Sequence, residues 1–563
     1  MQNGTDTQEK NGTHSGGVFV LDYGAGNVRS VYNALRLAGC EFKVVASAED
    51  IHCASRLIFP GVGAFGQAMN ALKSKGYFEA LRAYLHSGKP FFGICIGLQV
   101  LCLGSEESEG TEGLGIIPEK IRKFPENPTS PCPHIGWNRV KTLPESHSQA
   151  AGALLDPQQR LYFVHSYHLP LTEASREWTA CLTDYGETRN FVSAVQRGAV
   201  FATQFHPEKS GGAGVEILRR FLTWAPSPQI PKGGPLPESV LSSSTELSRR
   251  VIACLDVRTN DTGDLVVTKG DQYDVREKGE GGEVRNLGKP VDLARRYFEE
   301  GADEVTFLNI TSFANSPLED VPMLEVLRRA SETVFVPLTV GGGIRDLKDP
   351  DGTLRPALEV AGLYFRSGAD KVSIGSDAVY AAKAFWERGG KGDGTSSIEQ
   401  IAEAYGKQAV VVSVDPKRVY VKGPGETTNQ TIETCLPGLD GESVCWYACT
   451  VKGGRETTDL GVVELVTAVE ALGAGEILLN CIDRDGTNSG FDLELIRLVK
   501  SKVGIPVIAS SGAGSAAHFV EVFRETTADA ALAAGIFHRR EVPISSVKQT
   551  LQTAEMPVRI LSS

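Results

Sequence analysis

The chain has 563 residues, of which 41% are hydrophobic and 22% charged, a composition typical of a globular protein with several domains. A formal net charge of −12 argues against a nucleic-acid groove as the main function but is compatible with a local basic pocket for a phosphorylated substrate. The eleven cysteines have neither CxxC nor Cys/His metal spacing, and no apolar run is long enough to span a membrane. We therefore expect reduced thiols, no metal, no cofactor, and no nucleic-acid or membrane partner.

The first 16 residues, MQNGTDTQEKNGTHSG, are polar and lack the apolar stretch of a signal peptide. We interpret them as a disordered tail. Because no clear plastid transit peptide is seen either, we expect a cytoplasmic protein.

Residues 17–225 alternate apolar runs with amphipathic stretches, which predicts an α/β domain. GGVFVLDYG (16–24), EFKVVAS (41–47) and SRLIFPGVGAF (55–65) are interpreted as strands with their following turns. NVRSVYNALRLAGC (27–40) is interpreted as a helix.

A cysteine stands on a tight turn in FFGICIGLQV (91–100), where Cys95 lies between Gly93 and Gly97. An apolar run leads in and leucines at helical spacing follow, so strand, sharp turn and helix are expected in the geometry of a nucleophile elbow. Such a turn exposes the thiol, and the helix N-terminus behind it favours a thiolate. A small buried cysteine in a core strand explains this stretch about equally well.

Two further segments could complete a site around this cysteine. VFATQFHPEKS (200–210) places His206 and Glu208 just after a strand, where a base and the carboxylate that orients it would be needed. PGVG (60–63) follows another strand, and its backbone N–H groups could stabilise an oxyanion.

Residues 226–248 are rich in Pro, Gly and Ser and are expected to form a linker to a second domain over 249–563. This domain contains an internal repeat. Four strand signals recur in the same order: VIACLDVR (251–258) with VVVSVDPKR (410–418), GADEVTFLNI (301–310) with GAGEILLNCI (473–482), VPLTVGGGI (336–344) with IPVIASSGAG (505–514), and GADKVSIGSDAVY (368–380) with TADAALAAGIFHR (527–539). Eight strands in two similar halves predict a (β/α)8 TIM barrel, rather than two doubly wound domains.

The repeat pairs the residues expected at the barrel mouth. Asp256 ends the first strand and Asp415 the fifth, so they should face each other as an acid/base pair, although each could simply cap the next turn. Two Gly-rich groups are expected to bind the two phosphates of a long substrate, although tight packing could also explain them. They comprise Gly342, Gly343 and Ser376 in one half, and Ser510, Gly512, Gly514, Ala534 and Gly535 in the other.

In the order PGVG, GICIGLQ and HPE, the first domain resembles class I glutamine amidotransferases. DYGAGN (22–27) and IGWN (135–138) narrow the resemblance to the glutaminase of imidazole glycerol phosphate synthases, and residues 249–560 resemble the cyclase barrel of the same family. The presence of both domains on one chain resembles the fused fungal or plant form of this family. The pattern departs at Ser511, Asn309 and Asn480, where family members often have other small residues.

The resemblance implies roles for individual residues. Cys95 would attack the glutamine amide, His206 would protonate the leaving ammonia, and Glu208 would orient His206. The oxyanion and glutamine would be held by Gly61, Val62, Gly63 and Gln99. Asp256 and Asp415 would be the cyclase acid and base, with Lys269 in a substrate loop and Asp485 supporting the substrate.

The resemblance also implies an ammonia path. Arg250, Glu304, Lys371 and Glu476 stand at strand starts and would gate entry to the barrel interior, although a solvated salt-bridge ring is the simpler interpretation. Ammonia would condense with a bis-phosphorylated ribulosyl aminoimidazole carboxamide ribonucleotide, and the products would be imidazole glycerol phosphate and aminoimidazole carboxamide ribotide. A monomer is expected because both subunits are fused.

Two other classes of function remain open at this point. A barrel isomerase of the preceding step would also use paired aspartates and phosphate sites, but it needs no ammonia. A non-catalytic metabolite-binding protein would not need the Cys95, His206 and Glu208 set. Segments 385–400 and 421–440 are interpreted as insertions of unassigned role.

Overall fold

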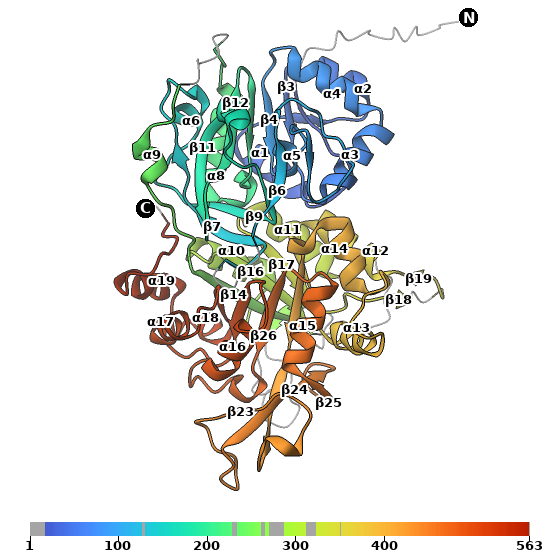
Figure 1. The fold of residues 1–563 in the computed structure, drawn as a ribbon, viewed down its shortest axis with the longest axis vertical. Helices are drawn as coiled ribbons and strands as arrows, with labels where there is room; N and C mark the ends of the chain where they lie inside the picture. The colour runs from blue at the N-terminus through green and yellow to red at the C-terminus, as the bar shows by residue number, and fades with distance from the viewer. Residues whose placement is uncertain are drawn as a thin grey trace, which may run out of the picture.

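The computed structural model describes residues 17–125, 130–227, 234–259, 265–268, 287–310, 322–348 and 351–561. Two bodies are stacked along the long axis of the molecule (Figure 1). The N-terminal one is a sheet covered by helices, and the C-terminal one is a closed barrel with a small sheet projecting from its far end. Among the helices of these ranges, none is both long enough and apolar enough to traverse a lipid bilayer.

An eight-stranded mixed sheet forms the centre of the N-terminal domain. Its strand order is β2 (Phe42–Val44), β1 (Val18–Val20), β3 (Arg56–Phe59), β4 (Phe91–Ile94), β13 (Val200–Thr203), β12 (Thr188–Arg197), β11 (Thr179–Tyr185) and β8 (Lys141–Thr142). The apolar runs that predict β1, β3 and β4 are buried on both faces, as parallel central strands require. In the parallel β4–β13 pair Ile94 lies opposite Thr203, so the residues that follow both strands emerge at the same sheet edge.

Helices cover both faces of this sheet and build two separate cores. One face carries α2 (Ala48–Cys53), α3 (Phe65–Ser74) and α4 (Tyr77–His86), and the other carries α1 (Arg29–Leu37), α6 (Gln149–Leu154) and α8 (Gly211–Thr223). The remaining helical elements are α5 (Ile96–Gln99), α7 (Glu173–Arg176), α9 (Glu238–Ser242) and η1 (Pro207–Lys209). A three-stranded sheet consists of β5 (Gly104–Ser105), β6 (Lys120–Lys123) and β10 (Tyr167–His168), and a two-stranded sheet consists of β7 (His134–Asn138) and β9 (Leu161–His165).

Eight parallel strands close the barrel through the pairing of the first with the last, as the repeat predicts. In order they are β14 (Arg250–Thr259), β16 (Glu304–Asn309), β17 (Leu338–Gly341), β20 (Lys371–Ile374), β21 (Val410–Val414), β26 (Glu476–Asn480), β27 (Val507–Ser510) and β28 (Ala530–Ala533). The described helices around them are α10 (Pro290–Glu299), α11 (Pro322–Thr333), α12 (Ala357–Ser367), α13 (Ser376–Glu387), α14 (Ser397–Tyr405), α15 (Val462–Leu472), α16 (Leu493–Lys500), α17 (Ala516–Glu525), α18 (Gly535–His538) and α19 (Ile544–Thr553).

The segment interpreted as an insertion at 421–440 belongs to a four-stranded antiparallel sheet that projects beyond the barrel (Figure 1). Its strands are β22 (Pro416–Val421), β23 (Ile432–Glu433), β24 (Val444–Val451) and β25 (Glu456–Gly461). The stretch 385–400 comprises the last residues of α13, the first residues of α14 and the connection between them. Short strands β15 (Leu265–Thr268), β18 (Leu347–Lys348) and β19 (Leu354–Arg355), and the 3-10 turns η3 (Lys407–Ala409), η4 (Pro424–Glu426) and η5 (Ile482–Arg484), complete the described elements.

The two domains meet where the two-stranded β7–β9 sheet packs on the barrel. Ile135, Trp137 and Tyr162 from this sheet belong to the same buried cluster as the barrel strands and helices. Trp137 donates a hydrogen bond from Nε1 to the carbonyl oxygen of Asp303, at 3.1 Å. Because Asp303 immediately precedes β16, the glutaminase-like domain covers the N-terminal end of the barrel strands.

Candidate functional site

The turn around Cys95 has the strained geometry of a nucleophile elbow. Cys95 follows β4 with φ 52° and ψ −99°, a conformation that side-chain-bearing residues rarely adopt. A Cβ on Gly93 would lie 2.4 Å from the carbonyl oxygen of Gly97, and a Cβ on Gly97 would lie 2.1 Å from that of Phe59. Both flanking glycines are therefore required for the chain to turn this sharply.

The helix expected behind this turn is much shorter than the leucine spacing predicts. α5 is one turn, because the chain bends again after Gln99 and leads into β5. So short a helix contributes little dipole, and the charge that faces Cys95 comes instead from a side chain.

That side chain is His206, which the strand register brings to Cys95. His206 Nδ1 lies 2.8 Å from Glu208 Oε1, and His206 is 1% exposed. Burial alone would lower the pKa of His206, but the negative charges of Glu208 and Cys95 outweigh burial and raise it to about 10. The imidazole is thus held as a cation beside the sulfur, ready to supply a proton.

The PGVG segment lies against this turn. A Cβ on Gly61 would lie 2.9 Å from Ile96, the residue after Cys95, and equally close to the ring of Tyr23. The Tyr23 hydroxyl donates a hydrogen bond to the carbonyl oxygen of Val62 at 3.1 Å, and Gly63 has φ 152°. The backbone predicted to hold the oxyanion is therefore next to the elbow.

Two buried glutamines lie beside the thiol. Gln99 Nε2 is 3.2 Å from both the carbonyl oxygen of Tyr167 and Gln204 Oε1. Gln204 Nε2 is 3.4 Å from Cys95 Sγ. Sequence reasoning named Gln99 but missed Gln204, although Gln204 stands only two positions before His206.

At the other end of the barrel, a cavity of about 560 Å³ opens at the carboxyl ends of the strands. Among the residues predicted for the cyclase, it is lined by Asp256, Asp415, Gly342, Gly343, Ser376, Asp485, Ser510, Gly512, Ala534 and Gly535. Asp256 does not end its strand as expected, because β14 continues to Thr259, whereas Asp415 directly follows β21. Since β14 and β21 are the first and fifth of the eight barrel strands, the two aspartates lie on opposite walls. Lys269 lies outside the described residues.

Gly514 does not line this cavity. Its N–H donates a hydrogen bond to His518 Nδ1 at 3.1 Å, and a Cβ there would lie 2.3 Å from the carbonyl oxygen of Asn488. The glycine thus serves close packing, which was the alternative interpretation of these glycines.

Five cationic side chains also line the cavity. The sequence reasoning did not single them out: Arg258, Arg345, Lys452, Arg455 and Arg539.

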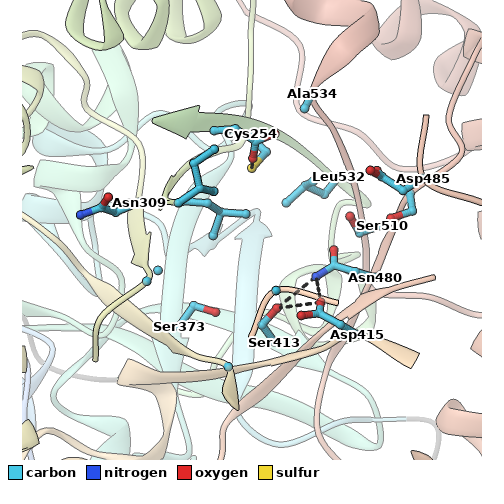
Figure 2. Close-up of a pocket in the computed structure, with 18 of the residues that line it drawn as sticks. Cys254, Asn309, Ser373, Ser413, Asp415, Asn480, Asp485, Ser510, Leu532 and Ala534 are labelled. Carbon is cyan, nitrogen blue, oxygen red and sulfur yellow. Dashed lines mark hydrogen bonds between the residues drawn. The ribbon is translucent and has the colours of Figure 1, made fainter. Parts of the chain in front are cut away.

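Asp415 is held by a small polar network (Figure 2). Asn480 donates hydrogen bonds from Nδ2 to Asp415 Oδ1 at 2.8 Å and to Ser413 Oγ at 3.0 Å. Burial raises the pKa of Asp415, and the hydrogen bonds from Asn480 and Ser413 oppose that rise. Asn480, noted in the sequence only as a departure, therefore positions the carboxylate.

The two loops predicted to bind phosphate share a left-handed backbone, and the departure at Ser511 lies in one of them. Gly342 has φ 93°, and by the repeat its counterpart is Ser511, with φ 74°. A Cβ on Gly342 would lie 2.2 Å from the carbonyl oxygen of Asn309, so this position requires glycine. Ser511 adopts the same unusual conformation with a side chain.

The four residues predicted as a gate form one buried cluster at the barrel base. Lys371 Nζ lies 2.7 Å from both Glu304 and Glu476, and Arg250 pairs with the same two carboxylates. Each side chain is at most 1% exposed, so the ring is not solvated. Burial alone would raise the pKa of Glu476, but Arg250 and Lys371 lower it below its usual value.

An apolar layer fills the barrel between this ring and the cavity. It consists of Ile252, Cys254, Val411, Leu478, Ile508, Ala530 and Leu532, with Leu308 and Ala534 packed against it. Cys254, Leu308, Leu532 and Ala534 also line the cavity. A charged ring, an apolar layer and a polar cavity thus follow one another along the barrel axis.

Comparison with known proteins identifies the family. The family model "Glutamine amidotransferase class-I" matches residues 19–224, and "Histidine biosynthesis protein" matches 250–543. The chain is 57% identical to imidazole glycerol phosphate synthase hisHF of Emericella nidulans, covering 96% of this chain and 98% of the relative. The chain belongs to the imidazole glycerol phosphate synthase family. The relative from Schizosaccharomyces pombe is 55% identical, with 96% and 99% covered.

The family membership confirms the resemblance seen in the sequence. This synthase-family chain is a bifunctional enzyme, with a glutamine amidotransferase domain followed by a cyclase barrel. An isomerase and a non-catalytic binding protein are therefore excluded. A relative from Arabidopsis thaliana, 55% identical over 96% of this chain and 89% of its own length, carries "chloroplastic" in its name.

Proposed function

We propose that Cys95, His206 and Glu208 carry out glutamine hydrolysis. Cys95 Sγ attacks the side-chain amide carbon, forming a C–S bond and an oxyanion that backbone N–H groups of Gly61 to Gly63 stabilise. The C–N bond breaks as His206 gives its proton to the leaving nitrogen, which departs as ammonia. Water then cleaves the glutamyl thioester to glutamate. The observation that carries this proposal is the strained Cys95 beside a His206 held by Glu208 at 2.8 Å.

In the barrel, we propose that ammonia condenses with the ribulosyl carbonyl of the bis-phosphorylated aminoimidazole carboxamide ribonucleotide. Asp256 and Asp415 would exchange protons during ring closure and cleavage to imidazole glycerol phosphate and aminoimidazole carboxamide ribotide. The two Gly-rich loops and the five cations of the cavity suit a substrate with a phosphate at each end. The assignments of Lys269 and Asp485 to substrate contacts stay predictions.

We propose further that ammonia passes through the barrel. The glutaminase covers the barrel base, where Arg250, Glu304, Lys371 and Glu476 would gate the entry. Beyond them, the apolar layer suits neutral ammonia and disfavours its protonation to ammonium. This arrangement keeps the ammonia out of bulk water between the two sites.

Replacing the nucleophile tests the proposal. Cys95→Ala should lose glutamine-dependent formation of both products but keep formation with added ammonium salts, because the barrel needs only ammonia. The assay supplies purified full chain with the ribulosyl substrate and follows both products. Failure of ammonium to rescue the variant would contradict the modular mechanism, and glutamine-dependent turnover by the variant would contradict the role of Cys95.

Three further statements stay predictions. We infer a monomer from the fusion of both domains, which sedimentation at about the 60.4 kDa chain mass would test. The boundaries of the linker at 226–248 can be tested by limited proteolysis. The cytoplasmic location expected from the sequence is tested by cell fractionation.

A further inference from the structure

A buried pair of glutamine side chains reaches the sulfur of Cys95 from the side of the sheet. Gln204, between β13 and η1, is completely buried, and Gln99 in α5 is 4% exposed. Gln204 Nε2 lies 3.4 Å from Cys95 Sγ, within the range of a hydrogen bond to sulfur. The reaction proposed above gives Gln204 no part, yet its amide touches the reacting atom.

The surroundings determine which end of the Gln204 amide faces the sulfur. The carbonyl oxygen of Tyr167 can only accept a hydrogen bond, so the Gln99 NH2 group must point toward it. The same NH2 group lies 3.2 Å from Gln204 Oε1, which therefore accepts. The NH2 end of Gln204 is then the end that faces Cys95. Tyr167, Gln99 and Gln204 thus form a chain of donors and acceptors with one consistent orientation.

We propose that Gln204 is a catalytic residue of the glutaminase, donating a hydrogen bond that stabilises the thiolate of Cys95 and holds its sulfur in position for attack. The inference rests on the proposed role of Cys95 as nucleophile. A donor favours the charged form of its acceptor, and a buried sulfur has no water to replace a lost donor. Gln99 acts through Gln204 as a positioning residue.

Another group also acts electrostatically on this sulfur. His206 presents a cation, held in place by Glu208. His206 must give up its proton during the reaction, whereas the Gln204 amide does not titrate. Gln204 therefore keeps its donor whatever the protonation state of His206, both before the attack and when hydrolysis of the thioester releases the thiolate again.

Two variants of the full chain separate this role from simple packing. Gln204→Leu removes the donor, and Gln204→Glu keeps the shape while replacing the donor by an acceptor. The matched control is Gln196→Leu, because Gln196 is also a buried amide, 4% exposed, that bonds to Ser148 and Gly198 away from the sulfur. Thermal unfolding of each full chain checks that the N-terminal domain is folded, because ammonium-dependent synthase activity reports only on the barrel.

The measurement is the rate of Cys95 alkylation by iodoacetamide across pH, followed by mass spectrometry of the Cys95 peptide. Losing a hydrogen bond to a charged group should raise the pH midpoint of alkylation by roughly one to two pH units in Gln204→Leu. Gln204→Glu should raise it at least as far. The alkylation midpoint of Gln196→Leu should match that of the unchanged chain.

A Gln204→Leu or Gln204→Glu protein that unfolds like the unchanged chain but shows an unchanged alkylation midpoint would overturn the inference. A different result would overturn the nucleophile assignment itself: complete alkylation of Cys95 in the unchanged chain without loss of glutamine-dependent turnover. The two failures are therefore distinguishable.

Discussion

Among single residues, we expect the charge state of His206 to set the pH range of the glutaminase. Its pKa of about 10 means that the imidazolium persists below that pH and is lost as pH rises through it. We expect kcat/KM for glutamine to fall on the alkaline side near pH 10. In Glu208→Gln one of the charges that raises this pKa is gone, so the alkaline limb should move to lower pH, by about one to three units.

Steady-state glutamine hydrolysis in the presence of imidazole glycerol phosphate measures this profile. Glu216→Gln is the control, because Glu216 is a carboxylate on the surface of α8 that pairs only with Arg219 and Arg220 among the described residues. An alkaline limb that stays in place in Glu208→Gln would contradict the role of Glu208.

Asn480 offers a second test at this scale. Because its hydrogen bond opposes the rise that burial causes in the pKa of Asp415, Asn480→Leu should raise that pKa further. In the plot of ammonium-dependent synthase rate against pH, the limb caused by titration of Asp415 should then move to higher pH. Movement of the acidic limb would make Asp415 the base, and movement of the alkaline limb would make it the acid. A profile unchanged in both limbs would contradict the contact.

At the scale of elements, the turns after β17 and β27 require particular backbone conformations. Gly342→Ala places a Cβ 2.2 Å from the carbonyl oxygen of Asn309, and φ there is 93°. We expect this variant to lose about 1–3 kcal/mol in the free energy of unfolding and to bind the ribulosyl substrate more weakly. Chemical denaturation and the KM for that substrate measure both effects.

Two substitutions control for this prediction. Gly423→Ala adds the same methyl group where nothing lies within 4 Å and the backbone is extended, so it should be neutral. Ser511→Gly relieves the left-handed conformation at the repeated position and should keep full activity. Equal stability of Gly342→Ala and Gly423→Ala would refute the steric argument.

Much of the element-scale structure could be predicted from the sequence. The repeat predicts the eight barrel strands, and the Gly-Ile-Cys-Ile-Gly run predicts the turn at Cys95, because both depend on local patterns of apolar residues and glycine. The length of α5 and the packing role of Gly514 could not be predicted, since each depends on the segment that packs against it.

At the scale of the whole molecule, the buried ring at the barrel base should control whether ammonia reaches the cyclase. Lys371→Met leaves Arg250 with two buried carboxylates, Glu304 and Glu476, and so leaves an uncompensated negative charge. We expect glutamine hydrolysis to exceed product formation in this variant, whereas in the unchanged chain the two should match. Ammonium-dependent synthesis should persist, because ammonium can enter from the cavity.

Lys500→Met is the control, because Lys500 forms an equally short buried pair with Asp529, at 2.8 Å, on the outside of the barrel. Simultaneous assay of glutamate and imidazole glycerol phosphate gives the ratio. A ratio of one in Lys371→Met, with full activity, would contradict a gating role for the ring.

The sequence by itself determined the class of chemistry: a cysteine on a tight turn, a histidine and glutamate after a strand, and two aspartates at repeated strand ends. These signals are local, so they survive without knowledge of contacts. Only the tertiary structure decided that Gln204 touches Cys95, that Asn480 holds Asp415, and that the ring at the barrel base is buried beneath the glutaminase. Such contacts join residues far apart in the chain, and only strand pairing and barrel closure bring them together.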